Sequence, residues 1–295
     1  QSLQYYPHMF VLPDGRVLAS SSNRAPMASL LLDTTIQTWT TVDPAVLDGG
    51  SAAMYLPGKV IKSGLARDPD DTPASSVATT YVLDMTQASP AWRQTASMAF
   101  PRTEHNLTLL PDGTVLVIGG SRNSDVGDTA SAVLEAELWS PATESWTTLA
   151  AMKTPRMYHS TVLLLPDGRV LVAGGGSDFP EVDQLSAEIY SPPYLFKGPR
   201  PAISSAPGNV HYAAGFSVTT PDGARIGSVS LLRLAAVTHA FNQNQRFVPL
   251  TFQPAAGGLT VQAPASANLA PPGYYMLFIV DTNGVPSVAA MVNIG

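Results

Sequence analysis

A turn motif followed by an apolar run recurs along the first two-thirds of the chain and constrains its fold more than any other feature. Complete copies are residues 13–18 (PDGRVL), 111–120 (PDGTVLVIGG) and 166–175 (PDGRVLVAGG), and residues 57–61 (PGKVI) are a degenerate copy. The starting prolines are separated by 44, 54 and 55 residues. Proline fixes φ at the first turn position and Asp-Gly supplies tight-turn chemistry, so each copy predicts a β-hairpin.

A strand that ends near a tryptophan completes each of the first three predicted units. Trp39, Trp92 and Trp146 follow apolar runs at comparable places downstream of the turn. Units of about 50 residues with four short strands, a Gly-Gly pair and a downstream aromatic residue are typical of Kelch-type propeller blades. The alternative is a set of unrelated hairpins in a β-sandwich, which the regular spacing disfavours. The sequence therefore predicts an all-β fold with four blade units.

The last third of the chain has a different pattern. Residues 191–198 (SPPYLFKG) carry prolines that do not suit a central strand. About seven short alternating runs follow, which is typical of an immunoglobulin-like sandwich. Residues 221–223 (PDG) repeat the turn without a Gly-Gly pair, and we interpret them as a hairpin of this second domain. The predicted division is a partial propeller over residues 1–197 and an immunoglobulin-like (E-set) sandwich over residues 198–295.

Composition excludes several classes of protein and site. The chain of 295 residues is 45% hydrophobic and only 13% charged, which argues against disorder. Its net charge is −6 without a basic block, so a nucleic-acid partner is not expected. No apolar run is long enough for a membrane span. There is no Cys, so disulfides, thiolate metal sites and a Cys nucleophile are excluded within this chain.

Two of the five histidines stand out by their context. His159 follows Tyr158 directly before the first strand of the fourth unit, and His239 lies in residues 237–241 (VTHAF) of the second domain. Imidazole is a frequent metal ligand and suits copper. An isolated histidine is nevertheless more often structural, so the pattern alone leaves both interpretations open.

Several ordered motifs resemble the galactose oxidase/glyoxal oxidase family of copper radical oxidases. Residues 156–160 (RMYHS) and 164–170 (LLPDGRV) resemble its copper-binding blade, and residues 238–246 (THAFNQNQR) resemble the segment of a second copper ligand. Residues 272–278 (PGYYMLF) and 284–287 (GVPS) resemble the closing strands of its C-terminal domain. The resemblance implies a seven-bladed Kelch-type ring, of which this chain carries about four blades.

The resemblance implies that copper is bound by Tyr158, His159 and His239, with Tyr158 as the axial, catalytic tyrosine that takes the proton of the alcohol. Neighbouring side chains on a regular strand point to opposite faces, so Tyr158 and His159 can reach one metal only if the backbone turns there. His239 must then arrive from the second domain on a loop that enters the propeller.

The function implied is that of the C-terminal part of a secreted, extracellular copper radical oxidase. Such an enzyme oxidises small primary alcohols, sugars or aldehydes with O₂ and gives hydrogen peroxide. The family places its radical on a tyrosine cross-linked to a cysteine, so we expect this Tyr–Cys cofactor to come from missing N-terminal residues. Tyr5 and Tyr6, at the start of the first unit, are interpreted as structural or pocket-wall residues.

A second motif, residues 102–105 (RTEH), lies one unit earlier. We predict that His105 holds the place equivalent to His159 and that Glu104 lies near the copper face, where two alternatives stay open: its carboxylate tunes the site, or it faces solvent. Residues 67–74 and 123–129 are predicted to be loops of the substrate pocket.

An alternative function is a non-catalytic Kelch/immunoglobulin-like module that binds carbohydrate or protein. Tyr158, His159 and His239 together favour the enzyme, whereas the lack of Cys favours the module for this chain taken alone. Four blades cut from a larger ring leave exposed strand edges, and such edges recruit partners. We therefore expect an N-terminal half-chain, or a second copy of this chain, to complete the propeller.

Overall fold

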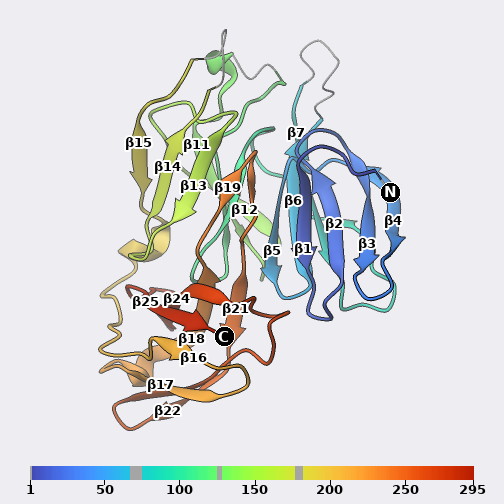
Figure 1. Cartoon of the computed structure of the whole chain (residues 1–295). Coiled ribbons are helices and arrows are strands. Elements are labelled where there is room, and N and C mark those ends of the chain that lie inside the picture. Colours follow the sequence, from blue (N-terminus) through green and yellow to red (C-terminus); the bar gives the residue numbers. More distant parts are fainter. Residues whose placement is uncertain (1, 67–74, 125–127, 177–181) are drawn as a thin grey trace.

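A computed structural model describes residues 2–66, 75–124, 128–176 and 182–295. The chain is all-β, with three short 3₁₀ helices in the described residues (Figure 1). The four predicted blade units are confirmed as four antiparallel sheets, each built from strands that follow one another along the chain.

Three of these sheets, blades 1 to 3, have four strands each, and blade 4 has three in the described residues. Blade 1 consists of β1 (Pro7–Val11), β2 (Val17–Ser22), β3 (Met27–Asp33) and β4 (Thr38–Leu47). Blade 2 consists of β5 (Ser51–Leu56), β6 (Lys59–Leu65), β7 (Val77–Asp84) and β8 (Arg93–Gln94). Blade 3 consists of β9 (Asn106–Leu109), β10 (Val115–Ile118), β11 (Glu135–Ser140) and β12 (Ser145–Ala151). Blade 4 consists of β13 (Ser160–Leu164), β14 (Val170–Gly174) and β15 (Ala187–Tyr190).

The Pro-Asp-Gly turns behave as predicted. Gly15, Gly113 and Gly168 have φ of 88°, 83° and 78°, a conformation that glycine adopts without steric cost. The aspartate before each glycine accepts a hydrogen bond from the backbone N–H two residues further on. These turns join the first two strands of blades 1, 3 and 4.

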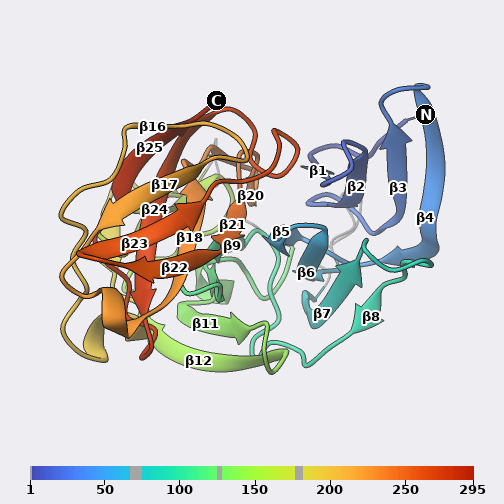
Figure 2. The ribbon, with the colours of Figure 1, turned by 90° about the horizontal axis from the view of Figure 1, so that it is seen from below.

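The blades pack side by side through apolar faces. Their first strands β1, β5, β9 and β13 contact one another in this order, and Figure 2 shows blades 1, 2 and 3 following one another around an arc. Phe10, Leu18 and Leu31 are cross-strand partners in blade 1 and are buried in the core shared with blade 2. Among the described residues, no contact of comparable extent joins β13 to β1. The blades therefore form an open partial propeller.

The second region is a β-sandwich, as predicted for an E-set domain. One sheet has the order β16-β25-β24-β18-β21 and the other the order β17-β23-β22. The strands are β16 (Asn209–Val210), β17 (Gly215–Thr219), β18 (Ile226–Arg233), β21 (Phe247–Leu250), β22 (Phe252–Ala255), β23 (Gly258–Gln262), β24 (Gly273–Asp281) and β25 (Ala290–Ile294).

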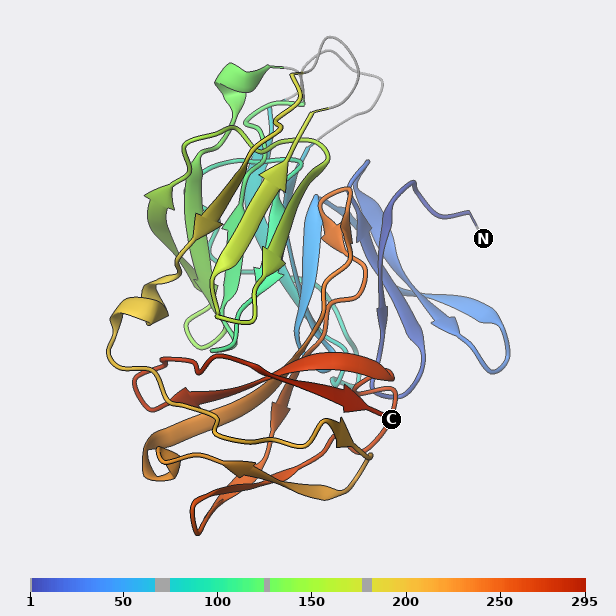
Figure 3. The same ribbon diagram turned by 60° about the vertical axis from the view of Figure 1, so that its left-hand side comes forward.

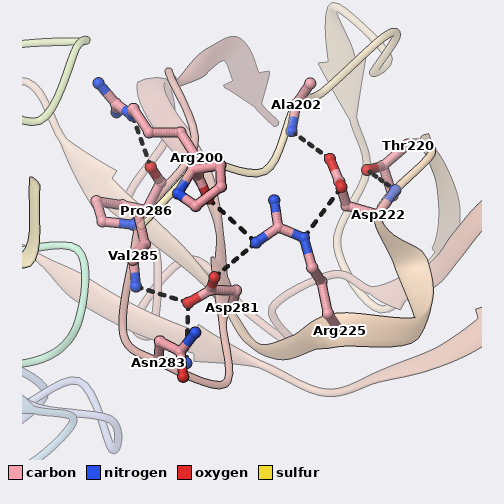
Figure 4. A network of polar contacts seen from close by, with 10 residues as sticks. Arg200, Ala202, Thr220, Asp222, Arg225, Asp281, Asn283, Val285 and Pro286 are labelled. Carbon is pink, nitrogen blue, oxygen red and sulfur yellow. Dashed lines mark hydrogen bonds and ion pairs between the residues drawn. The ribbon is translucent and has the colours of Figure 1, made fainter. Parts of the chain in front are cut away.

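The prediction of a hairpin at residues 221–223 is wrong. The strands on either side, β17 and β18, belong to different sheets of the sandwich. The 3₁₀ helix η3 (Gly223–Arg225) turns the chain between them, and Arg225 forms ion pairs with Asp222 (3.0 Å) and Asp281 (2.7 Å). Figure 4 shows Arg225 between the two carboxylates. This charged bridge holds the crossover from one sheet to the other.

Arg200 fixes the connection between the two regions. Its guanidinium donates to the carbonyls of Pro286 and Ser287 in the sandwich and to that of Asp167 in the turn of blade 4 (Figure 4 shows Arg200 beside Pro286). The predicted division at residues 197/198 falls between β15 and β16, just after the 3₁₀ helix η2 (Pro193–Phe196), and stays a prediction.

A hairpin leaves the sandwich and enters the space among the blades (Figures 1 and 3). It is formed by β19 (Val237–Thr238) and β20 (Phe241–Asn242), and it contacts β13, β9 and β5. Gln245, just after it, accepts a hydrogen bond from Met54 N and donates to Ala52 O, so its amide pairs with strand β5. A segment of the second domain thus enters the propeller, as expected for the one that carries His239.

Candidate functional site

The site is built on an unusual backbone conformation at the start of the blades. Tyr6, Glu104 and His159 each lie seven residues before the turn proline of their own blade, and their φ values are 53°, 56° and 59°. Left-handed φ is uncommon for residues other than glycine, and such strain often accompanies functional sites. The turn of the backbone at His159 is therefore present, as its proposed partnership with Tyr158 requires.

The two histidines of the predicted site face each other across the two domains. His159 Nε2 and His239 Nε2 are 3.3 Å apart. The other ring nitrogen of each is anchored: His159 Nδ1 lies 3.2 Å from the Gly176 carbonyl, and His239 Nδ1 lies 2.7 Å from Thr238 Oγ1. A carbonyl can only accept, so His159 carries its proton on Nδ1 and turns the lone pair of Nε2 toward His239.

Tyr158 joins this pair. Its ring stacks on that of His159, with centroids 3.7 Å apart and planes inclined by 29°. It meets the ring of His239 edge-on, with centroids 5.8 Å apart. The three side chains singled out from the sequence therefore lie together, and their role as copper ligands stays a prediction.

The electrostatic environment keeps His239 neutral. Its pKa lies below the usual range, first because of its partial burial and then because of the neighbouring His159. Neutral imidazole is the form that binds a metal ion. In the described part of the chain, no three His, Asp or Glu side chains are grouped so as to hold a metal. A metal at this point therefore depends on the phenol of Tyr158 as well as the two imidazoles.

Tyr6 was placed among structural or pocket-wall residues, and the structure brings it into the site. Its ring stacks flat on His239, with centroids 3.8 Å apart and planes inclined by only 9°. Tyr5 instead is 77% exposed and lies beside Tyr6, with centroids 6.3 Å apart. The sequence carried a clue to Tyr6, namely the seven-residue spacing to the turn proline that it shares with His159.

Two buried polar residues, Asn23 and Glu104, support the backbone of the site. Asn23 Nδ2 donates to Glu104 Oε2 (2.9 Å) and to the His239 carbonyl (3.0 Å). Glu104 is only 2% exposed, so its carboxylate lies inside the propeller close to the site, as expected. Asn23 was not identified from the sequence, because no motif distinguishes it from other polar residues at strand ends.

The predicted equivalence of His105 and His159 does not hold. His105 is fully buried, and its Nε2 lies 3.1 Å from Ser63 Oγ. Burial, and then the charge of Arg102, hold its pKa well below the usual range. In blade 3 the left-handed residue is Glu104, one position earlier, and His105 turns inward. The predicted pocket loops, residues 67–74 and 125–127 of 123–129, lie outside the described residues.

Comparisons with known proteins agree with the fold and the motifs. Residues 58–194 match the family model described as glyoxal oxidase N-terminus, and residues 200–294 match the galactose oxidase-like Early set domain. A solved fungal alcohol oxidase of the AA5 family, in complex with copper, superposes with a TM-score of 0.87 at 28% identity. That match covers 98% of this chain and 63% of the alcohol oxidase.

Curated relatives are similar over most of this chain. Galactose oxidase from Gibberella zeae is 32% identical over 83% of the chain, and aldehyde oxidase GLOX from Vitis pseudoreticulata is 32% identical over 98% of it. The chain spans 37% of the former and 62% of the latter. With both family models, the copper-containing structural neighbour and these relatives in agreement, the chain belongs to the galactose oxidase/glyoxal oxidase family.

Proposed function

We propose that Tyr158, His159 and His239 bind one copper ion. The observation that carries this proposal is the 3.3 Å approach of two Nε2 atoms whose Nδ1 atoms are anchored elsewhere. Metal-bound histidines are commonly held in this way, with the second nitrogen hydrogen-bonded to a carbonyl or another polar group. In the absence of metal, an Nε2–H of His239 can donate to Nε2 of His159 at this distance, and a copper ion would take the place of that proton. Imidazole and phenolate are both suitable copper ligands.

The activity proposed is oxidation of small primary alcohols, sugars or aldehydes by O₂, with hydrogen peroxide as the second product. The names of the relatives, galactose oxidase and aldehyde oxidase, and the copper-containing alcohol oxidase support this class. Bound copper would supply Lewis-acid polarisation of the substrate hydroxyl and one-electron exchange. The phenol of Tyr158, when ionised, is the base that accepts the hydroxyl proton. The rings of Tyr6 and Tyr158 stack on the imidazoles of His239 and His159.

The residues of this chain do not fit the Tyr–Cys cofactor of the family, because the chain contains no Cys. Tyr6 and Tyr158 are both beside the imidazoles, yet neither has a thiol partner here. We propose that the cysteine is supplied by another polypeptide segment and that this chain alone turns over no alcohol.

Two apolar faces support a polypeptide partner that completes the propeller. On the free face of blade 1, the cross-strand partners Val11, Val17 and Leu32 are only half-buried. A groove of about 560 Å³ lies elsewhere on blade 1, lined by residues 2–5 and by Met27, Ala28 and Leu30 of β3. On the free face of blade 4, Ile189 of β15 is 46% exposed, and its cross-strand partner in β14 is the half-buried Leu171.

We propose that these faces are covered by the family's remaining blades, carried by an N-terminal half-chain, or by a second copy of this chain. The alternative occupants are separated by mass measurement and solution scattering. A compact 31.0 kDa monomer with a closed four-blade ring would overturn the proposal.

We also propose an extracellular location. The described residues contain no helix long and apolar enough to cross a membrane.

The copper proposal is tested by titrating the purified chain with Cu(II) against a competing chelator. We expect one copper per chain, and loss of that site in His159→Ala and in His239→Ala. The matched control is His211→Ala, which removes an exposed histidine whose Nδ1 contacts the Gly295 carbonyl, far from the site. Equal loss in the control, or full retention in both ligand variants, would overturn the assignment. Robust peroxide production by the chain alone would overturn the proposed need for a cysteine.

A further inference from the structure

The turn that carries His239 has a backbone that its sequence does not favour. His239 and Ala240 are the two central residues of a hairpin closed by the pair Thr238 and Phe241. Their φ values are 48° and 60°, the positive pair that marks a type I′ turn. Such turns strongly prefer Asn-Gly or Gly-Gly, whereas His and Ala pay about 1–3 kcal/mol each for this region. Something outside the hairpin must therefore hold the turn.

The propeller supplies two hydrogen bonds at this place. The carbonyl of His239 accepts from Asn23 Nδ2 (3.0 Å), and the carbonyl of Ala240 accepts from Ser51 Oγ (2.6 Å). The hairpin's own strand pairing, between Thr238 and Phe241, leaves both carbonyls free for these donors. Asn23 and Ser51 are 1% and 0% exposed, so water does not compete for either bond.

Each donor is itself fixed by blade 3. Asn23, just beyond β2 in blade 1, also donates to Glu104 Oε2. Ser51, the first residue of β5 in blade 2, accepts from Leu107 N in β9. An amide NH₂ has two donors and a hydroxyl has one, so both residues use all of their side-chain donors in these contacts. The position of the His239 turn is thus set jointly by three blades.

We infer that Asn23 and Ser51 are positioning residues that hold the His239–Ala240 turn in its left-handed conformation and aim the His239 imidazole at His159. The inference rests on the proposed copper site for its consequence, but the conformational role stands independently of any metal. Loss of a supporting contact around a metal ligand typically costs 10–100-fold in metal affinity, and a change of about that size is expected here.

The test compares Asn23→Asp and Ser51→Ala with Ser230→Ala. Ser230 is also buried and also donates to a carbonyl across the domain boundary, that of Pro111, but it does not touch the turn. Hydrogen exchange of the metal-free protein over residues 234–246 is the first readout. We expect faster exchange in the first two variants and wild-type exchange in the control. Copper affinity is the second readout, with a 10–100-fold loss expected in the first two variants only.

Two further variants separate positioning from general destabilisation. Asn23→Asp places a carboxylate beside Glu104, and adding Glu104→Gln removes that repulsion without restoring a donor to the His239 carbonyl. We expect the double variant to regain thermal stability but not hairpin protection. Glycine adopts positive φ at no cost, so adding Ala240→Gly to Ser51→Ala is expected to recover part of the protection.

The outcomes distinguish this inference from the copper proposal. Faster hairpin exchange in Asn23→Asp and Ser51→Ala, with a wild-type protein that binds no copper, refutes the copper site and supports the positioning role. Wild-type exchange and copper affinity in both variants overturns the positioning role and leaves the copper site intact. Equal effects in Ser230→Ala would also overturn it, since the role would then be generic.

Discussion

Blades 3 and 4 begin with the same Pro-Arg-X-X-His pattern, yet blade 3 buries its histidine and blade 4 presents its histidine to the proposed copper site. Arg102 and Arg156 occupy matching places, and each donates through Nη1 to the carbonyl of the first glycine of its Gly-Gly pair, 2.9 Å away in both blades. From this shared anchor, blade 3 reaches its left-handed residue after two positions, at Glu104, and blade 4 after three, at His159.

The extra residue of blade 4 is what creates the site. Counting from the arginine aligns His105 with His159, whereas counting back from the turn proline aligns Glu104 with His159. Backbone conformation follows the second count, since both Glu104 and His159 have positive φ. The additional position admits Tyr158 beside the imidazole. A one-residue difference ahead of a strand thus decides whether a histidine is a core residue or a candidate ligand.

The largest expected effect is on the free energy of unfolding when either of the two arginines is replaced. Arg102 and its partner Glu137 are both fully buried and 2.6 Å apart. Arg102→Met would leave a buried carboxylate without its partner, at a cost of about 3–5 kcal/mol in the free energy of unfolding. Glu188, the partner of Arg156, is 3.7 Å away and 24% exposed, so its carboxylate can be rehydrated. Arg156→Met is expected to cost about 1–2 kcal/mol less, as measured by denaturant unfolding. Equal costs would contradict this account.

Much of this could be predicted from the sequence, and the exceptions have physical causes. The blades were predictable from turn chemistry, and the proximity of Tyr158, His159 and His239 was predictable from motif resemblance. Both signals lie in short stretches of sequence. The prediction of a hairpin at residues 221–223 was wrong because a Pro-Asp-Gly sequence can also form a crossover between two sheets. Here Arg225 stabilises the crossover by pairing with the nearby Asp222 and the distant Asp281.

The remaining exceptions depend on contacts far apart in the sequence. The site roles of Tyr6 and Asn23 arise from contacts with a hairpin more than 200 residues away, and no local pattern encodes such contacts. The position of His105 depends on whether blades 3 and 4 are aligned from the arginine or from the turn proline. The sequence alone permits both alignments. Local sequence patterns therefore predict the strands and turns, whereas long-range contacts between these elements determine which residues support the site.

A second prediction concerns copper and the two equivalent-looking histidines. His159→Ala is expected to weaken copper binding by more than about 100-fold, a larger effect than that of losing a supporting contact. His105→Ala is expected to change copper affinity less than about threefold, because its imidazole is buried against Ser63. Chelator competition measures both variants under one condition. A large loss of affinity in His105→Ala would show that the two blades are less different than the structure implies.

The third prediction uses the Gly-Gly pairs. A Cβ atom on Gly119 or Gly120 would lie only 2.4 Å from a neighbouring carbonyl oxygen, that of Arg156 or Thr103. Gly175 has more space, with its nearest atom 3.4 Å from the same point. Positive φ strains an alanine at every one of these positions. Gly120→Ala is therefore expected to destabilise the protein by about 1–2 kcal/mol more than Gly175→Ala in thermal unfolding. Equal destabilisation by the two substitutions would mean that blade 4 is packed as tightly as blade 3.

A fourth prediction is a pH dependence that arises from buried imidazoles. The folded-state pKa of His105 lies well below its unfolded value of 6.5, and that of His8 is lowered to about 3 by burial and then by Lys62. As the pH falls below 6.5, these two histidines bind protons in the unfolded state but stay neutral in the folded state. Stability is therefore full above pH 6.5 and is lost below it, by up to about 1.4 kcal/mol per pH unit for each group.

His105→Gln is expected to reduce this slope between pH 6.5 and 4.5. Urea unfolding at several pH values measures the slope. An undiminished slope in His105→Gln would show that this imidazole is protonated in the folded protein, contrary to its burial.

The most direct test of the central claim is a crystal structure of the copper-soaked chain, with anomalous diffraction recorded at the copper absorption edge. The account predicts one strong anomalous peak, within about 2 Å of Nε2 of both His159 and His239 and close to the phenol oxygen of Tyr158. A well-ordered site with the two Nε2 atoms still facing each other and no copper between them, or copper bound only elsewhere on the chain, would contradict it.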